Sequence, residues 1–259
     1  MGNESKAILV TGASSGLGAE MARQFADLGY DLALCARRLD RLEALHTEIL
    51  AAHPDRRVEV AACDVTHDDP SDPDSVFGVF KRFAASLGQL DRIVINAGLG
   101  KGAPLGTGGY RANRETAMTN FVGTLAQTEA AMEVFRAQGG GHLVMVSSMS
   151  AMRGLPKTMT TYAATKAGVA HLAEGLRTEL YGKPGWQITV LYPGYIASEM
   201  NDGVAAAQNK MMVSTEVGVA AMVKAIESET ASACVPPLPW APLSVAMKYA
   251  PLPVFKRMI

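Results

Sequence analysis

The segment Thr11-Gly12-Ala13-Ser14-Ser15-Gly16-Leu17-Gly18 is the most informative part of this 259-residue chain. It follows an apolar run, Ala7–Thr11, that predicts a strand, and a helical pattern begins near residue 17. Glycines let the backbone turn tightly and approach a pyrophosphate, which then lies at the positive end of the helix dipole. The spacing is GxxxGxG rather than GxGxxG, so the loop alone is a weak indication. Its position after the first strand strengthens a prediction of nucleotide binding.

Short apolar runs and longer helical patterns alternate along the rest of the chain. The predicted strands are Ala7–Thr11, Asp31–Ala36, Val58–Cys63, Arg92–Asn96, His142–Ser147, Gln187–Tyr192 and a short one near Ser232–Val235. The predicted helices lie at about residues 17–28, 39–52, 73–87, 111–137, 161–181 and 215–228. The middle strands are almost wholly apolar, which is typical of strands covered on both faces. We therefore expect an α/β fold: a doubly wound, Rossmann-like parallel sheet of about seven strands with helices on both faces, in one domain over residues 1–259.

Composition excludes several classes of protein. The chain has 24 basic and 25 acidic residues, a net charge of −1 and no Lys/Arg block, so nucleic acid is not an expected partner. The longest uncharged stretch, Thr230–Met247, contains four prolines, which would break a spanning helix. No apolar signal core precedes the first strand, and neither the three cysteines nor the five histidines have metal-ligand spacing. We expect a cytoplasmic protein with no metal.

The end of the second predicted strand selects the cofactor. An acidic residue there would bind the adenosine ribose of NAD, but the run is Leu34-Cys35-Ala36-Arg37-Arg38. Two guanidiniums suit a 2′-phosphate, so the pattern favours NADP(H), although Arg37 and Arg38 also fit the start of a solvated helix. Asp64 would accept from the adenine amino group. Asn96-Ala97-Gly98 offers small residues that let the backbone pass close to a ligand.

Tyr162 and Lys166 are the candidate catalytic pair. A separation of four residues places both side chains on one helix face. A fixed cation nearby lowers the pKa of a phenol from its usual value of about 10. Ser147 and Ser148 end the fifth predicted strand, at the carboxyl edge where ligands bind in such sheets.

In this order, the motifs resemble those of the short-chain dehydrogenases/reductases, in their single-domain form. The resemblance covers residues 6 to about 200. Thr11–Gly18 is similar to the TGxxxGxG loop, Asn96–Gly98 to the NAG motif, Tyr162–Lys166 to YxxxK and Pro193-Gly194 to the PG motif. Asp64 resembles the adenine aspartate of the family, Asn120 its helix asparagine and Ser148 its catalytic serine.

The resemblance implies NAD(P)-dependent interconversion of a carbonyl and an alcohol. Tyr162 would donate a proton to the developing alkoxide, and Ser148 would hydrogen-bond the carbonyl oxygen. Lys166 would lower the pKa of Tyr162 and hold the nicotinamide ribose, while Asn120 would support a water in a proton relay. The cofactor-binding residues expected in this way are Gly12, Ser14, Ser15, Gly16, Leu17, Gly18, Arg37, Arg38, Asp64, Val65, Asn96, Ala97, Gly98, Tyr162, Lys166, Pro193, Gly194, Ile196 and Ser198.

The chain departs from the family at the catalytic serine. The family most often places this serine thirteen residues before the tyrosine, whereas Ser148 is fourteen and Ser150 twelve residues before Tyr162. One extra residue within Lys157–Thr161 keeps Ser148 as the catalytic serine, and Ser150 is the alternative. We expect Ser147 to be structural.

Residues 195–213 match the position of the substrate loop of the family. Met200, Met211 and Met212 in this loop, with Met149 and Met152 near Ser148, favour an apolar or lipid-like carbonyl or alcohol substrate. The alternative is that these methionines pack the core.

Residues 235–259 form an apolar C-terminal tail. It holds six of the 13 prolines, with Trp240, Tyr249 and Phe255, and no acid follows Glu229. Peripheral contact with a membrane is one interpretation. Packing on its own domain or on a neighbouring subunit is the favoured one, since members of the family are usually homodimers or homotetramers.

Two functions compete with an NADPH-dependent oxidoreductase. A non-catalytic NADP-binding sensor or scaffold would not need Asn120, Ser148, Tyr162 and Lys166 together. An isomerase or dehydratase on the same scaffold stays open.

Overall fold

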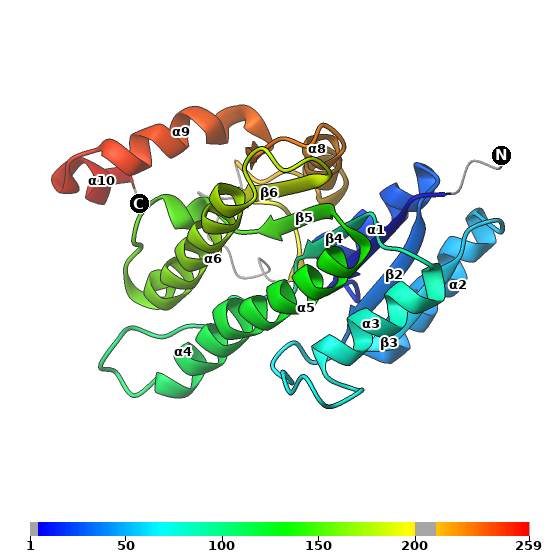
Figure 1. Ribbon diagram of the computed structural model, residues 1–259. Coiled ribbons are helices and arrows are strands. Elements are labelled where there is room, and N and C mark those ends of the chain that lie inside the picture. The colour runs from blue at the N-terminus through cyan, green and yellow to red at the C-terminus, as the bar shows by residue number, and fades with distance from the viewer. Residues whose placement is uncertain (1–4, 200–210, 259) are drawn as a thin grey trace.

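The computed structural model describes residues 5–199 and 211–258. Within these residues, seven strands form one parallel sheet in the order β3-β2-β1-β4-β5-β6-β7 (Figure 1). The strands are β1 (Ala7–Thr11), β2 (Asp31–Ala36), β3 (Val58–Ala62), β4 (Arg92–Ile95), β5 (Gly141–Val146), β6 (Trp186–Pro193) and β7 (Ser232–Val235). The strand order reverses between β1 and β4, and ligands bind at such a switch point in open α/β sheets.

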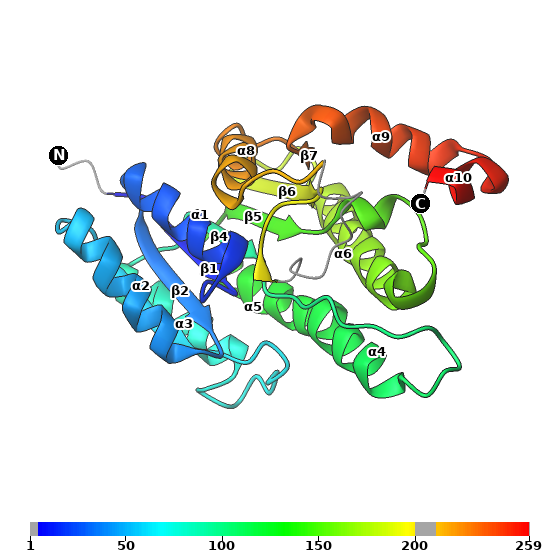
Figure 2. The same ribbon diagram turned by 180° about the vertical axis from the view of Figure 1, so that it is seen from behind.

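Helices cover both faces of the sheet. On one face lie α1 (Gly16–Asp27), α2 (Leu39–Ala52) and α8 (Thr215–Glu227). On the other face lie α3 (Val76–Leu87), α5 (Gly123–Gln138) and α6 (Thr160–Glu179). Figures 1 and 2 show the two layers from opposite sides. Each layer encloses a separate apolar cluster against the sheet, which explains the almost wholly apolar inner strands. The predicted α/β, Rossmann-like, single-domain fold is confirmed.

The predicted helix over residues 111–137 is divided into three segments. An α-helix, α4 (Tyr110–Ala117), leads into a π-helix, η1 (Met118–Val122), and α5 follows directly. π-turns occur mostly as single turns inside α-helices, and the sequence-based prediction treated this stretch as one continuous helix. The helix predicted to begin at residue 73 begins at Val76, where the Ser75 side chain caps it by accepting from the Gly78 amide at 3.4 Å.

The C-terminal tail is helical, although no helix was predicted there from the sequence. It forms α9 (Pro237–Tyr249) and α10 (Leu252–Met258), drawn in red and orange in Figure 1. Pro242 has no amide hydrogen to donate to residue 238, and Leu238 is itself non-helical, so the helix loses little there. None of the helices that the structure describes has the length and apolarity needed to cross a membrane.

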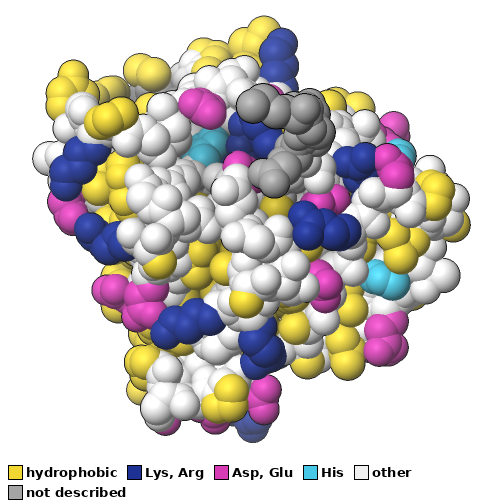
Figure 3. Space-filling view, turned by 45° about the vertical axis from the view of Figure 1, so that its right-hand side comes forward, with side chains coloured by type: hydrophobic (Ala, Val, Ile, Leu, Met, Phe, Trp, Pro, Cys, Tyr) yellow, Lys and Arg dark blue, Asp and Glu magenta, His cyan; other side chains and the backbone are white. Residues whose placement is uncertain are grey.

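Charged side chains of both signs are mixed over the face shown in Figure 3. No large area of one sign stands out on that face, in keeping with the net charge of −1. The local charge at the nucleotide end therefore depends on a few particular residues.

His142 is a buried histidine at the start of β5, and its side chain is 3% exposed. Its Nε2 lies 2.8 Å from the Thr189 hydroxyl oxygen, and that hydroxyl donates to the Thr230 carbonyl. Nε2 must therefore carry the hydrogen, while Nδ1 has no partner among the described atoms. Burial, with a contribution from Arg92, lowers the pKa of His142 to about 3.

We predict that His142 makes the protein less stable in acid. Because its pKa is lower in the folded than in the unfolded chain, protons favour the unfolded chain as pH falls below the ordinary value of about 6.5. Between pH 7.5 and pH 5 this amounts to about 2 kcal/mol. In urea denaturation, the unfolding free energy of the wild type should therefore fall about 2 kcal/mol more over this pH interval than that of His142→Gln. His171→Gln, at an exposed helix position, is the control, and an equal loss in both variants would contradict the prediction.

Candidate active site

The loop between β1 and α1 requires its glycines. Gly12 and Gly16 have φ values of +66° and +54°, in the left-handed region that favours glycine. A Cβ on Gly18 would lie 2.4 Å from the Gly12 carbonyl oxygen. The loop is therefore tightly closed, and only glycine fits at these positions.

Thr11, a residue that the sequence analysis did not single out as functional, joins this loop to β4. Its buried Oγ1 accepts from the amides of Asn96 and Ala97, both at 3.0 Å. The Asn96 Nδ2 donates to the Thr11 carbonyl at 2.9 Å. Asn96 therefore supports the glycine loop, in addition to ending β4 with a short side chain. Thr11 is a polar residue at the end of the otherwise apolar strand β1, and this feature of the sequence could have indicated its role.

The start of α1 fits an anionic ligand. Ser15 is the N-cap residue, but its side chain makes no capping hydrogen bond, and the first turn contains no acid. The first amides of a helix have no partner within the helix, so these point out from a closed glycine loop at the positive end of the dipole. The predicted loop residues Ser14, Ser15, Gly16, Leu17 and Gly18 thus fit a dinucleotide pyrophosphate.

Arg38 lies beside this loop. Its Nη2 donates to the Ser15 hydroxyl at 2.6 Å, and its Nε donates to the Ser14 hydroxyl at 3.3 Å. Its Nη1 pairs with Glu199 at 3.2 Å, and Arg41 pairs with the same carboxylate at 2.5 Å. Arg37 is exposed. Arg41 was not predicted as a site residue, although it lies one helical turn beyond Arg38.

Asp64 and Val65 follow β3 on the adenine side of the expected site. Asp64 Oδ1 accepts from the Thr66 amide at 3.0 Å and from its hydroxyl at 2.8 Å. The Asp64 carboxylate is exposed, and both of these hydrogen bonds are accepted by Oδ1. Val65 is buried, and its carbonyl oxygen would lie 2.9 Å from a Cβ on Gly123.

Ser148 and Tyr162 come together in the fold, since the Ser148 side chain acts to lower the pKa of the Tyr162 phenol. Ser148 follows β5, and its Oγ accepts from the Ser150 amide at 3.2 Å. Tyr162 lies in the first turn of α6. Ser150 is 5% exposed, and its hydroxyl has no partner among the described atoms. The geometry therefore brings Ser148 to Tyr162, while the Ser147 hydroxyl donates to the Lys166 carbonyl at 2.7 Å.

Lys166 lies beneath Tyr162 with its ammonium buried. Nζ donates to the Val146 carbonyl at 3.0 Å and lies 5.9 Å from the centroid of the Tyr162 ring. Desolvation lowers the pKa of Lys166 to about 8.

The pKa of Tyr162 differs from the expectation that Lys166 lowers it. Burial raises this pKa above its ordinary value, and the hydrogen bond with Ser148 opposes the rise without cancelling it. The Lys166 ammonium faces a backbone carbonyl of β5, which explains why the phenol gains little from it.

Asn120 lies in the π-helix η1 and is fully buried. Its Oδ1 accepts from the Leu99 amide and its Nδ2 donates to the Leu99 carbonyl, each at 2.8 Å. A Cβ on Gly98 would lie 3.2 Å from Asn120 Oδ1 and 3.4 Å from Lys166 Nζ. The missing side chain of Gly98 thus leaves room for Asn120 and Lys166, and Asn120 uses one hydrogen bond at each polar atom of its side chain to hold Leu99. Its expected role in binding a water stays a prediction.

The segment after β6 continues the site toward α1. Pro193 ends β6, and a Cβ on Gly194 would lie 2.0 Å from the indole of Trp240. A side chain at position 194 would therefore clash with Trp240 of the tail. Gly194 is also one of the residues expected to bind the cofactor. Ile196 is buried, and the Ser198 Cβ would lie 3.4 Å from a Cβ on Gly16.

The structure separates the methionines expected around the substrate. Met149 and Met152 pack with Trp240, Met247 and Phe255 of the tail, so they belong to a packed cluster. Met211 and Met212 are partly exposed, and Met200 lies outside the described residues.

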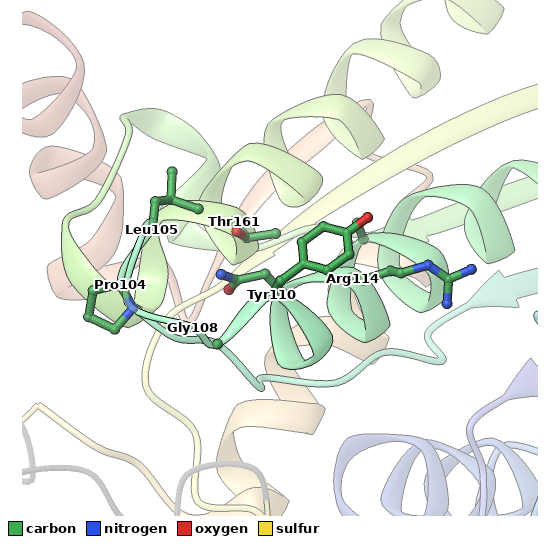
Figure 4. Close-up of a pocket in the computed structure, with 10 residues that line it drawn as sticks. Pro104, Leu105, Gly108, Tyr110, Arg114 and Thr161 are labelled. Atoms are coloured by element: carbon green, nitrogen blue, oxygen red, sulfur yellow. The ribbon is translucent and has the colours of Figure 1, made fainter.

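An open cleft of about 470 Å³ lies beside the first turn of α6. Figure 4 shows Leu105, Tyr110 and Thr161 around it, with Arg114 extending away from Pro104 and Leu105. Thr161, which directly precedes Tyr162 in the chain, contributes to the lining of the cleft. Its lining residues are Pro104, Leu105, Gly106, Gly108, Gly109, Tyr110, Asn113, Arg114, Ala117 and Thr161.

Comparison with known proteins identifies the family. The model of the short chain dehydrogenase family matches residues 6–209. An uncharacterized oxidoreductase of Mycobacterium tuberculosis is 47% identical over 250 residues, which cover 96% of each chain. The 11-beta-hydroxysteroid dehydrogenase 1A of Arabidopsis thaliana is 35% identical over 199 residues, covering 76% of this chain and 54% of that one.

Among solved structures, a short chain dehydrogenase from Burkholderia cenocepacia in complex with NADP superposes with a TM-score of 0.77 at 25% identity. The match covers 90% of this chain and 96% of that one. The chain belongs to the short-chain dehydrogenase/reductase family and is an oxidoreductase with a fold that binds a nicotinamide dinucleotide.

The two serines provide a direct test of the site. Ser148→Ala removes the hydroxyl that contacts Tyr162, and we expect turnover to fall about a hundredfold or more. Ser150→Ala removes a buried hydroxyl without a partner, so turnover should be unchanged and stability equal or slightly higher. Steady-state kinetics measures the turnover of both variants, and thermal unfolding measures their stability. Loss of turnover in Ser150→Ala alone would show that Ser150, and not Ser148, is the catalytic serine.

Proposed function

We propose that this chain is an NADP(H)-dependent oxidoreductase that interconverts a carbonyl and an alcohol on an apolar small molecule, with Tyr162 as general acid and base. The observation that carries this proposal is the grouping of Ser148, Tyr162 and Lys166 at the carboxyl end of β5, with the buried Lys166 Nζ 5.9 Å from the centroid of the Tyr162 ring. The non-catalytic sensor is disfavoured because its function would not need this arrangement.

Tyr162 is suited to donate a proton in the reduction direction. A phenol with a raised pKa stays protonated at neutral pH, so it can deliver its proton to an alkoxide as that charge develops. Ser148 orients the carbonyl oxygen toward the phenol. NADPH, when bound, supplies the hydride. In the reverse direction the same tyrosine must first lose its proton, which favours higher pH.

Lys166 supplies a buried positive charge and a donor that can hold the cofactor ribose in position. An ammonium with a pKa of about 8 is mostly protonated at neutral pH, and burial makes its charge effective at short range. Its position next to Gly98 supports a role in holding ribose hydroxyls. Asn120 holds the Gly98-Leu99 segment that forms this wall.

The cofactor preference rests on the cations after β2. Arg38 joins the Ser14 and Ser15 hydroxyls and carries a fork of donors that suits a phosphate. Arg41, which pairs with the same Glu199 carboxylate as Arg38, adds charge at this place. These contacts support NADP(H) over NAD(H).

The substrate class rests on the cleft beside Thr161. Its lining is mainly apolar, with Pro104, Leu105, Tyr110 and Ala117. These side chains support an apolar substrate.

We predict that Tyr162→Phe abolishes turnover and leaves NADPH binding intact. Removing the proton donor should lower kcat by about a hundred- to ten-thousandfold. Turnover is followed by NADPH absorbance over a panel of aldehydes, steroids, quinones and 3-oxoacyl thioesters, and NADPH binding by calorimetry. Tyr181→Phe, at a site that is 88% exposed, is the matched control. Unchanged turnover in Tyr162→Phe would refute the proposal, and a non-catalytic sensor would show binding with no turnover in any variant.

We propose that the tail packs on its own domain in a cytoplasmic homodimer or homotetramer. Trp240, Met247 and Phe255 are buried, and Trp240 meets Tyr195 edge to face with ring centroids 5.4 Å apart. Arg153 lies 4.8 Å from the centroid of the Phe255 ring. These contacts support packing over insertion into lipid.

The tail proposal predicts that the full chain does not sediment with vesicles of phosphatidylcholine and phosphatidylserine. Light scattering should give the mass of a dimer or tetramer. Tyr249→Asp, at a position that is 72% exposed on the tail, should change neither NADPH binding nor vesicle sedimentation. Salt-sensitive sedimentation of the full chain that Tyr249→Asp abolishes would favour membrane contact.

A further inference from the structure

Glu199 pairs with two arginines of the nucleotide end. One carboxylate oxygen lies 3.2 Å from Arg38 Nη1 and the other lies 2.5 Å from Arg41 Nη1. Glu199 is remote in sequence from both arginines, since it follows β6 whereas Arg38 is the N-cap residue of α2 and Arg41 lies in its first turn. Together the three residues connect the two sides of the cofactor end of the sheet. The pairing lowers the pKa of Glu199, so the carboxylate is charged at neutral pH.

The backbone around Glu199 holds it in this position. The Ala197 amide donates to the Val213 carbonyl at 2.9 Å, and the Val213 amide donates to the Tyr195 carbonyl at 3.1 Å. The Thr215 hydroxyl donates to the Ala197 carbonyl at 2.6 Å. Ser198 lies against Gly16 at the start of α1. Glu199 therefore reaches Arg38 and Arg41 from a tethered segment that crosses the glycine loop.

Arg38 uses its whole donor fork in this arrangement. Nε faces Ser14, Nη2 faces Ser15 and Nη1 faces Glu199. The two serine hydroxyls come from the loop that a dinucleotide would contact. Among the described residues, Glu199 is the anion in this set, so it stands where a 2′-phosphate would take its charge-assisted hydrogen bonds.

We propose that Glu199 is an internal anionic ligand of the 2′-phosphate subsite, and that it sets the selectivity between NADP(H) and NAD(H). The proposal rests on the cofactor assignment above. A phosphate monoester carries about −1.5 to −2 charges and three acceptor oxygens, so it displaces a single carboxylate from two guanidiniums. NAD(H) lacks this group and binds with the ion pairs intact. Glu199 thus lowers the affinity for NADP(H) by the free energy of the pairs that must break.

The test compares 2′-phosphorylated and unphosphorylated ligands. Calorimetry measures 2′,5′-ADP, 5′-ADP, NADPH and NADH binding to the wild type and to Glu199→Gln, which keeps the size of the side chain and removes its charge. Exposed ion pairs are individually weak, so we expect 2′,5′-ADP and NADPH to bind Glu199→Gln about three- to tenfold more tightly. The affinities for 5′-ADP and NADH should not change.

Glu48→Gln is the matched control. Glu48 is an exposed carboxylate that also meets a guanidinium with both oxygens, at 2.7 and 3.0 Å from Arg23, and it lies on α2 away from the glycine loop. All four affinities should be unchanged in this variant. Equal affinities of Glu199→Gln and wild type for 2′,5′-ADP would overturn the inference, and so would weaker binding in the variant.

The outcomes separate this inference from the cofactor assignment. A wild type that prefers NADH, with Glu199→Gln gaining NADPH affinity, would refute the NADP(H) preference and support the role of Glu199. If the wild type prefers NADPH and Glu199→Gln has the same NADPH affinity as the wild type, the NADP(H) preference is supported and the role of Glu199 is refuted.

Discussion

The hydrogen bonds of Thr11 are the constraint on which the site depends. Thr11 ends β1, and its hydroxyl accepts two amides of the segment after β4, while Asn96 returns a bond to the Thr11 carbonyl. β1 and β4 are the neighbours between which the strand order reverses, so these bonds lie at the mouth of the ligand crevice. A buried hydroxyl left without partners would cost about 1–3 kcal/mol, and here the cost is avoided at the point from which the glycine loop departs.

The two ends of the site use charge in different ways. At the chemical end, Lys166 is buried, and a backbone carbonyl of β5 stabilises its ammonium. At the nucleotide end, Arg38, Arg41 and Glu199 are about half exposed, so their pairs are screened by salt and can exchange partners. A fixed, dry cation suits proton transfer, whereas an exchangeable set of charges suits reversible binding of a phosphate.

The sequence predicts most of the fold because the strands are buried on both faces. β1, β2 and β7 have the predicted bounds, since an apolar run between turn residues leaves few alternatives. It does not predict η1, because π-turns occur as single turns inside α-helices and residues 111–137 have the pattern of one long helix. The Glu199–Arg41 pair joins residues 158 positions apart, and only the folded chain brings them together. The pKa of Tyr162 was likewise inaccessible, because it depends on burial and on where the Lys166 ammonium points.

The tail is part of the support of the site. The family model ends at residue 209, but the match to the M. tuberculosis oxidoreductase covers 96% of this chain and therefore includes most of the tail. Trp240 takes the space that a side chain at Gly194 would need, and Met149, the residue after Ser148, packs in the same cluster. The tail thus braces both the turn after β6 and the segment that carries Ser148. A substitution that loosens Trp240 would reach the Ser148 hydroxyl through Met149 without any direct contact.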